Sequence, residues 1–157
     1  MSTPEELGIH FRKWPDTVQT LKSQAMVKLP FTNIAGIALG TTCTILTLGV
    51  IQIRRGKNIP SGDGGNELLK RRISGLRNFS EQAPLGIILL GLVEMNGAEY
   101  WQLAILTSAL VVGRVIHGYT FFNEKPWMFG RVGGMVMTAT SFMGSILCLA
   151  WQFLRST

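Results

Sequence analysis

The sequence predicts an all-α integral membrane protein whose 157 residues form a four-helix transmembrane bundle. Hydrophobic residues make up 46% of the chain, and they gather in long blocks. A helix needs about 20 mainly apolar residues to cross roughly 30 Å of hydrocarbon. Four blocks reach this length, and the chain has room for one domain. The spans that we expect are residues 29–53, 73–95, 99–122 and 131–154.

The first span, residues 29–53, reaches about 37 Å as a helix, which is enough to cross the bilayer with some tilt. A cluster of basic residues follows it, and basic residues concentrate in loops on the cytoplasmic side. The cluster therefore predicts that residues 54–72 and 123–130 face the cytoplasm or its equivalent. Because this cluster accounts for much of the net charge of +6, the charge does not indicate nucleic acid as a partner. Basic residues ahead of the span favour the opposite orientation: Arg12, Lys13, Lys22 and Lys28. The basic cluster consists of Arg54, Arg55, Lys57, Lys70, Arg71 and Arg72.

The second span, residues 73–95, is polar in its first half and apolar only from Leu85 to Val93. A short turn joins it to the third span, so the two helices must be antiparallel neighbours. The third span, residues 99–122, carries Arg114 and His117 near its end. The polar residues of the second span are Arg77, Asn78, Ser80, Glu81 and Gln82.

The antiparallel order brings polar side chains of these two spans to similar depths. Glu81 lies about eight residues from the start of the second span, and Arg114 about eight residues from the end of the third. At about 1.5 Å per residue, both lie roughly 12 Å below the same interface. We therefore expect Glu81 to pair with Arg114. Asn78 and His117 also lie at matching depth, each about five residues from the ends of their spans. Asn78 and Glu81 are three residues apart, which places them on one helix face.

This polar layer has two explanations. Charged groups inside a bilayer are costly, so they face the bundle interior or a water-filled cavity and often mark a functional site. The alternative is a structural ion pair between Glu81 and Arg114 that locks the helices together. Arg77 and Arg131 lie at nearby depth and add to the number of polar groups. A single structural bridge does not require so many, which favours a cavity open to water.

The fourth span, residues 131–154, is rich in small residues. Small side chains let helix backbones approach closely in membranes. We therefore expect this helix to pack tightly on its neighbours. The small residues in and just before it are Gly130, Gly133, Gly134, Ala139 and Gly144.

Four further side chains carry no predicted chemistry. Cys43 and Cys148 fall inside apolar blocks, where a thiol behaves as a small hydrophobe. Neither a disulfide framework nor a metal site is expected from them. Glu94 and Glu99 lie at the interface opposite the polar layer, and we expect water to surround both carboxylates.

Residues 1–28 form an N-terminal extension beyond the bundle of residues 29–157. The extension lacks the apolar core of a cleaved secretory signal, so the first span is expected to act as its own insertion signal. Thr3 and Glu6 match a capping box, with Pro4 at the first helical position. Short interfacial helices are therefore expected, lying on the membrane surface or docked on a protein partner.

Two motifs stand at a characteristic separation. Asn-Phe-Ser-Glu-Gln-Ala-Pro runs from Asn78 to Pro84, and Gly-Arg-Val-Ile-His ends at His117. Together they resemble the signature of the MAPEG family, the membrane-associated proteins in eicosanoid and glutathione metabolism, and its bacterial-type members above all. The stretch around Arg131, with Val132, Gly133 and Thr138, is similar to the start of the family's last helix. The resemblance covers residues 29–154.

The resemblance implies a left-handed four-helix bundle that assembles as a homotrimer, with glutathione bound between neighbouring subunits near the cytoplasmic side. Asn78 and Glu81 match the asparagine and glutamate that contact glutathione in the family. Arg114 matches an arginine of the family motif, and His117 stands where eicosanoid-type members have a tyrosine. Arg131 is the best match for the catalytic basic group, because a cation near a thiol favours the nucleophilic thiolate.

Two positions depart from the family pattern. Ser74 replaces the arginine expected four residues before the family asparagine, which removes an anchor for a glutathione carboxylate. Gln82 stands where a tyrosine is frequent. Arg71, Arg72 and Arg77 are the candidate substitutes for the missing anchor, and Arg77 lies about 60° from the Ser74 direction on a helix.

Two functions fit this pattern. The first is a MAPEG-type enzyme, a glutathione transferase or peroxidase acting on a lipophilic electrophile that enters from the bilayer. The second is a non-catalytic MAPEG-like accessory or scaffold subunit of a larger membrane complex, docked through residues 1–28, in which Ser74 marks a decayed site. A transporter or channel is disfavoured because the chain shows no inverted repeat and has too few spans.

Overall fold

The structure, a computed structural model, describes residues 28–123 and 127–156. Within these ranges it consists of four helices and no strand, so the all-α prediction is confirmed. Apart from Lys28, the predicted N-terminal extension lies outside the described residues. The helices are α2 (Pro30–Gly56), α3 (Glu67–Met95), α4 (Tyr100–Thr120) and α5 (Met128–Ser156).

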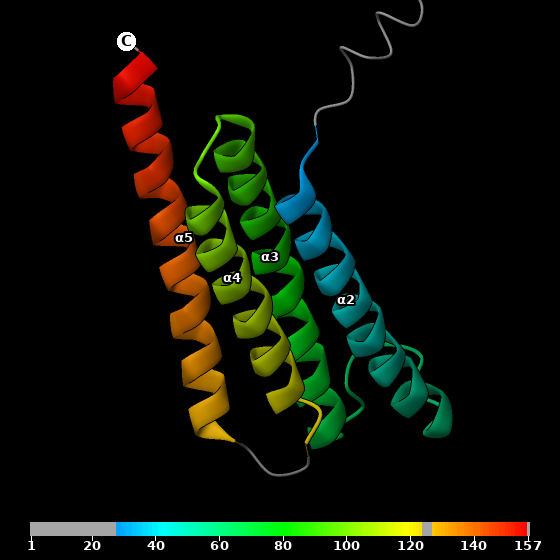
Figure 1. Cartoon of the computed structure of the whole chain (residues 1–157). Coiled ribbons are helices and arrows are strands. Elements are labelled where there is room, and N and C mark those ends of the chain that lie inside the picture. Colours follow the sequence, from blue (N-terminus) through cyan, green and yellow to red (C-terminus); the bar gives the residue numbers. More distant parts are fainter. Residues whose placement is uncertain (1–27, 124–126, 157) are drawn as a thin grey trace, which may run out of the picture.

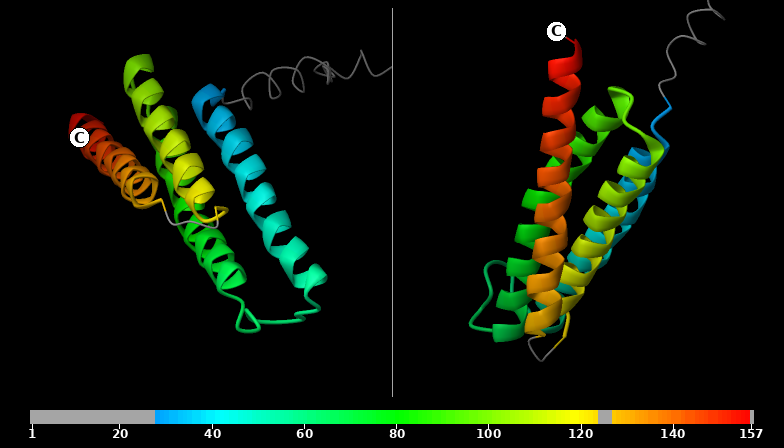
Figure 2. Two further views of the ribbon diagram at one scale, coloured as in Figure 1. Left: turned by 90° about the horizontal axis from the view of Figure 1, so that it is seen from below. Right: turned by 60° about the vertical axis from the view of Figure 1, so that its left-hand side comes forward.

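The four helices run alternately up and down (Figure 1). The left view of Figure 2 agrees with Figure 1 in placing α2 and α5 on the flanks, with α3 and α4 between them. Both central helices contact both flanking helices, whereas α2 and α5 do not pack against each other. The start of α2, the α3–α4 turn and the end of α5 share one end of the bundle, the terminal end. The other two connections lie at the opposite end, the loop end.

Helices α2, α3 and α5 extend beyond the predicted spans at the loop end. Helix α2 continues to Gly56, and α3 begins at Glu67 instead of residue 73. The Asn66 side chain caps α3, because its Oδ1 accepts a hydrogen bond of 2.9 Å from the Leu69 N–H. Hydropathy marks only the apolar part of a helix, so it missed these charged turns. Most of the basic cluster therefore stands on helix ends and not in a loop.

Three of the helices are long and apolar enough to cross a membrane: α2, α4 and α5. Helix α3 is not among them, because polar residues fill its first half. It nevertheless runs through the bundle in contact with the other three helices. Helix α3 is thus packed among the three apolar helices, and its crossing of the membrane as a fourth span stays a prediction.

Exposed aromatic side chains stand at both ends of the bundle. Tyrosine and tryptophan are enriched where a membrane meets water, since their rings are apolar and their polar atoms reach water. The two groups bracket the apolar middle of the helices and mark where the bilayer begins and ends. Tyr100, Trp101 and Trp151 stand at the terminal end, and Tyr119, Trp127 and Phe129 at the loop end.

The buried core consists of two apolar clusters, one above the other along the helices. Each cluster combines side chains from α2, α3 and α4, and Val111 touches both. The polar residues of the second predicted span therefore lie beside a dry core. Ala35, Leu90, Val93, Leu103 and Leu106 form the cluster nearer the terminal end, and Leu39, Leu46, Phe79, Ala83 and Leu110 form the other.

The closest backbone approach joins α4 to α5. A Cβ atom added at Gly134 would lie 2.6 Å from the Gly113 carbonyl oxygen and 2.9 Å from the His117 backbone nitrogen. A Cβ at Gly144 would lie 2.6 Å from a methyl group of Leu106. The predicted tight packing of the last helix is confirmed at these positions. At Gly133, in contrast, a Cβ would meet nothing within 4 Å.

The prediction that Glu94 is solvated is wrong. Its carboxylate accepts hydrogen bonds from the backbone N–H groups of Phe31 and Thr32, at 2.9 and 2.8 Å, and from the Thr32 hydroxyl at 2.6 Å. The first N–H groups of a helix lack partners within the helix, and the helix dipole favours a negative charge there. Glu94 of α3 therefore caps the start of α2. Leu29, the residue at the cap position, has no capping side chain of its own.

Candidate functional site

Arg114 is the centre of the polar layer, and its side chain is completely buried. Its Nε donates to the Thr138 hydroxyl at 2.9 Å, and its Nη1 donates to Oδ1 of the Asn78 side chain at 3.1 Å. Its Nη2 lies 3.5 Å from the sulfur of Met135. The guanidinium thus joins α4 to α3 and α5.

The predicted pair of Glu81 with Arg114 is wrong. Glu81 instead accepts a hydrogen bond of 3.1 Å from Arg77, four residues earlier on the same helix. Asn78 and Glu81 lie only about 60° apart around α3, but Asn78 is half-buried and accepts from Arg114, whereas Glu81 is exposed and accepts from Arg77. The depth estimate was adequate, because Asn78 and Glu81 are less than one turn apart. The choice of partner depended on the helix face.

Arg77 and Glu81 form an exposed ion pair near the middle of α3, where lipid would solvate their charges poorly. Their side chains are 81% and 59% exposed in the single chain. Glu81 stands midway between the two ends of α3. Charged groups at mid-membrane face protein or water and not lipid. A protein surface or a water-filled space must therefore cover this face of α3 in the membrane.

His117 lies one turn after Arg114 on α4 and is 2% exposed. Its predicted partner, Asn78, is taken by Arg114, and its Nδ1 is buried without a hydrogen-bond partner. The imidazole ring packs against Phe121, with ring centroids 5.2 Å apart. His117 is thus a buried polar group with unused hydrogen-bonding capacity, which is uncommon without a functional reason.

Arg131, at the start of α5, contacts the same Phe121 ring that packs against His117. Its guanidinium carbon lies 5.3 Å from the centre of the Phe121 ring, within the range of a cation–π interaction. Phe121 therefore separates Arg131 from His117. Sequence reasoning missed Phe121, although its spacing of four from His117 places both on one helix face.

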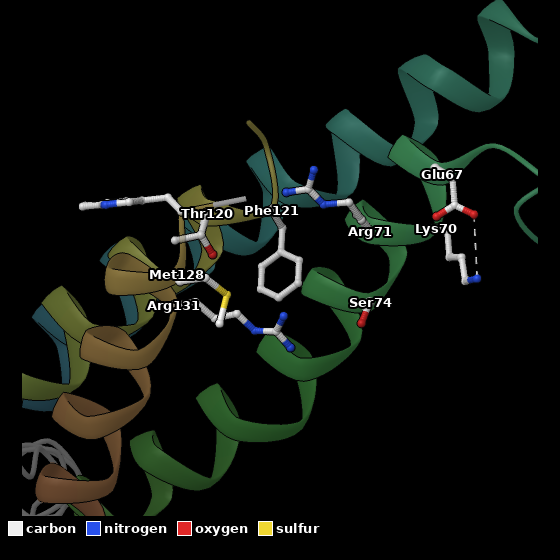
Figure 3. A pocket seen from close by; sticks show the side chains of 9 residues that line it. Glu67, Lys70, Arg71, Ser74, Thr120, Phe121, Met128 and Arg131 are labelled. Atoms are coloured by element: carbon white, nitrogen blue, oxygen red, sulfur yellow. Dashed lines mark ion pairs between the residues drawn. The ribbon is translucent and has the colours of Figure 1, made fainter. Parts of the chain in front are cut away.

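A hollow of about 240 Å³ opens beside Arg131 at the loop end. Figure 3 shows the Arg131 guanidinium next to the Phe121 ring, with Ser74 on the facing helix. Glu67 and Lys70 form an exposed ion pair of 3.9 Å at its rim. The hollow is lined from the start of α3, the end of α4 and the start of α5 by Glu67, Lys70, Arg71, Ser74, Thr120, Phe121, Trp127, Met128 and Arg131. We call it the basic hollow, because three cations and one carboxylate line it.

The predicted site residues thus fall into three groups. Asn78 and Arg114 are joined inside the bundle, and Arg77 and Glu81 are joined on the outer face of α3. Arg131 lines the basic hollow, while His117 lies behind Phe121. The hollow in the single chain is lined by none of Asn78, Arg114, Arg77 and Glu81. Ligand pockets usually measure about 300–1,000 Å³, so the hollow is also smaller than a typical site.

Arg114 carries a charge without a nearby counter-charge in the described part of the chain, where no carboxylate lies within 4 Å of it. Replacing Asn78 with aspartate would place a carboxylate where the amide oxygen accepts from Arg114. We expect Asn78→Asp to stabilise the protein by about 1 kcal/mol, because the carboxylate adds the attraction of opposite charges to the hydrogen bond that the amide already accepts from the guanidinium. Thermal unfolding in detergent would measure this. A melting temperature for Asn78→Asp below that of the wild type would contradict it.

Comparison with known proteins decides the family. A model of the MAPEG family matches residues 32–154, most of the chain and all four helices. The chain belongs to the MAPEG family. Its two motifs provide the central contact of the bundle, because the hydrogen bond from Arg114 to Asn78 joins one motif to the other. The spacing of the two motifs in this MAPEG protein therefore has a direct structural role.

The curated relatives of this MAPEG protein are membrane proteins. The chain is 33% identical over 103 residues to the inner membrane protein YecN of Escherichia coli K12. The matched stretch covers 65% of the chain and 76% of YecN. The same figures hold for YecN of Escherichia coli O6:H1. No solved structure gives a significant match. Together with the three apolar helices, these relatives show a multi-pass integral membrane protein.

Proposed function

We propose that this MAPEG protein binds glutathione and acts as a transferase or peroxidase on lipophilic electrophiles that enter from the bilayer. The observation that carries the proposal is the basic hollow with Arg131 at its side. Glutathione has two carboxylates and a thiol, so it needs cations at more than one point. The hollow offers them next to the membrane, where a lipophilic second substrate has access.

The residues of the hollow fit an anionic tripeptide. Lys70 and Arg71 stand one turn before Ser74 on the same side of α3, so they place positive charge where the family's anchoring arginine is missing. They are the candidates to hold a carboxylate. Their position revises the sequence-based expectation, since the exposed Arg77 is paired with Glu81 and does not line the hollow.

Arg131 and His117 are the candidates for the chemistry. Glutathione would supply a nucleophilic thiol. The Arg131 guanidinium is held over Phe121 and reaches the hollow, where its charge would favour the thiolate form. The unused Nδ1 of His117 would offer a hydrogen bond if Phe121 moved aside.

A homotrimer would complete this site. The exposed pair of Arg77 and Glu81 needs a protein or water neighbour at mid-membrane, and a second copy of the chain supplies one. A neighbouring copy would also enlarge the hollow, which is small for a ligand pocket on one chain. The lipid bilayer surrounds the remaining faces.

The proposal predicts glutathione binding that depends on Arg131. Calorimetry on detergent-purified protein should detect binding at millimolar glutathione, and Arg131→Ala should weaken it about tenfold or more, because a charge-assisted contact contributes roughly 1.5–3 kcal/mol. Glu81→Ala should weaken it as well, since the family contact is lost. Arg155→Ala is the matched control, because Arg155 is an exposed arginine at the terminal end that stacks on Trp151.

The outcomes of this titration separate activity from site assignment. If wild-type protein does not bind millimolar glutathione, the enzyme proposal fails. If it binds and neither Arg131→Ala nor Glu81→Ala changes the affinity, the proposed site is wrong. An equal loss in Arg155→Ala would show a non-specific charge effect and would also reject the site.

A second candidate function is an accessory or scaffold subunit without catalysis. The observation that favours it is that Asn78 and Glu81 are already hydrogen-bonded within the chain, to Arg114 and Arg77. Glutathione would have to compete with both contacts. In this alternative the polar layer holds the helices together, and the exposed face of α3 docks on another membrane protein. Absence of glutathione binding together with a stoichiometric partner in the purified material would support it.

A further inference from the structure

A second hollow, of about 420 Å³, lies at the loop end of α2, on helix and loop residues that the basic hollow does not share. It forms where the last turns of α2 meet the loop that follows. Asn58 turns the chain there with a positive φ of 51°, and the Ile59 N–H bonds back to the Arg54 carbonyl at 3.0 Å. We call it the α2 hollow, and its lining residues are Ile51, Arg54, Arg55, Asn58, Ile59 and Pro60.

The two arginines of the α2 hollow have unused capacity to bind an anion. Arg54 donates from Nη2 to the Gly62 carbonyl at 3.3 Å, and its Nε is buried without a partner. Arg55 is exposed. Among the described residues, no carboxylate lies within 4 Å of either guanidinium. The nearest acidic residue in the loop, Asp63, bonds instead to the Gly65 N–H at 3.0 Å.

The α2 hollow also has an apolar side that faces lipid. Ile51 is 36% exposed and stands on α2, which is long and apolar enough to span the membrane. Arg54 follows it by about one helical turn, a rise of roughly 5 Å. The hollow therefore extends from the depth of lipid chains to the depth of lipid headgroups. A free anion would use only the arginines, whereas a phospholipid would also contact Ile51 and Ile59.

We propose that the α2 hollow binds an anionic phospholipid, with the headgroup phosphate held by Arg54 and Arg55 and the chains lying along Ile51 and Ile59. Basic residues beside a membrane span attract anionic headgroups. The exposed Arg55 guanidinium can donate to the oxygens of a phosphate, and Arg54, which the bond to the Gly62 carbonyl holds at the same hollow, adds a second positive charge. The binding is independent of glutathione, since the two hollows share no lining residue.

Native mass spectrometry of the full chain in detergent tests this proposal with two lipids that share the same chains, dioleoylphosphatidylglycerol and dioleoylphosphatidylcholine. Wild-type protein should retain the anionic lipid in preference. Each basic residue near a headgroup contributes about fivefold to binding. Arg55→Gln should therefore lower the retention about fivefold, and Arg54→Gln with Arg55→Gln about 25-fold.

The controls keep the test decisive. The Arg55 side chain is exposed and makes no hydrogen bond or ion pair in the described chain, so Arg55→Gln should fold even if the double variant does not. Arg155→Gln removes the same charge at the terminal end and should keep the preference. Equal retention of the two lipids, an unchanged preference in Arg55→Gln, or an equal loss in Arg155→Gln would overturn the proposal. Displacement of the lipid by millimolar inorganic phosphate would show a free-anion site and would overturn it too.

Discussion

Gly134→Ala is expected to destabilise the protein by about 2 kcal/mol, because an inserted methyl group in a packed helix contact costs roughly 1–3 kcal/mol. The new Cβ would lie 2.6 Å from the Gly113 carbonyl oxygen and 2.8 Å from the His117 Cβ. These neighbours are backbone or near-backbone atoms, so they cannot rotate away. Helices α4 and α5 would have to separate, and the Arg114 to Thr138 bond between them would lengthen.

Gly133→Ala provides the matched control for this prediction. It adds the same methyl group one residue away on the same helix, where nothing lies within 4 Å. Alanine has a higher helix propensity than glycine, so Gly133→Ala should be neutral or slightly stabilising. In a thermal shift measurement, Gly134→Ala should melt about 4–8 °C lower, as expected for a chain of this size. Similar melting temperatures for the two variants would show that α4 and α5 do not meet as described.

Glu94→Ala is expected to destabilise the protein by about 2–3 kcal/mol, because hydrogen bonds to charged groups contribute roughly 1.5–3 kcal/mol and losing a helix cap costs about 1 kcal/mol. Three donors at the start of α2 would lose their acceptor. Two of these are backbone N–H groups, which no change of side chain can remove. The contact also fixes α2 against α3, so its loss loosens the flank of the bundle.

Glu94→Gln and Glu67→Gln sharpen this test. Glutamine keeps an acceptor oxygen but not the charge, so Glu94→Gln should lose about half as much stability as Glu94→Ala. Glu67 is an exposed carboxylate with a distant partner, and Glu67→Gln should change stability by less than about 0.5 kcal/mol. The same thermal measurement compares all three. A melting temperature for Glu94→Ala that matches Glu67→Gln would mean that the carboxylate is solvated after all.

The depth of the polar residues could be predicted from the sequence, because helix rise and a short connecting turn fix which residues lie level. The rotation of each helix could not. Asn78 and Glu81 are three residues apart, and the one that points inward was not the one expected to pair with Arg114. A charge of opposite sign is the natural guess for a partner. In the structure the partners of Arg114 are an amide and a hydroxyl, because Asn78 and Thr138 stand on the helix faces that meet Arg114.

The role of Glu94 was beyond sequence reasoning for a different reason. Its position at the end of an apolar run is equally compatible with water around it. Its partners are 62 and 63 residues away, at the start of another helix. Only the packing of α2 along α3 brings them together. Hydropathy likewise gave the spans but not the extra charged turns of α2 and α3, on which both hollows are built.

Some parts of the candidate site could be predicted from the sequence motifs, and others only from the packing of the helices. The motifs contain Asn78 and Arg114, which a hydrogen bond joins, whereas His117 packs against Phe121 instead of its predicted partner Asn78. They did not identify Phe121, which separates His117 from Arg131, because an aromatic residue near a helix end has many ordinary explanations. Residues Lys70 and Arg71 were assigned to a loop, whereas they stand on α3 beside Ser74.

We propose that the exposed Arg77–Glu81 face of α3 meets another copy of this chain and that this contact completes the site. The mass of the purified protein in mild detergent, measured by native mass spectrometry, tests it most directly. Three copies of the 17.3 kDa chain, about 52 kDa without lipid, are the predicted result. A single chain, or one copy in a stoichiometric complex with a different protein, would contradict it.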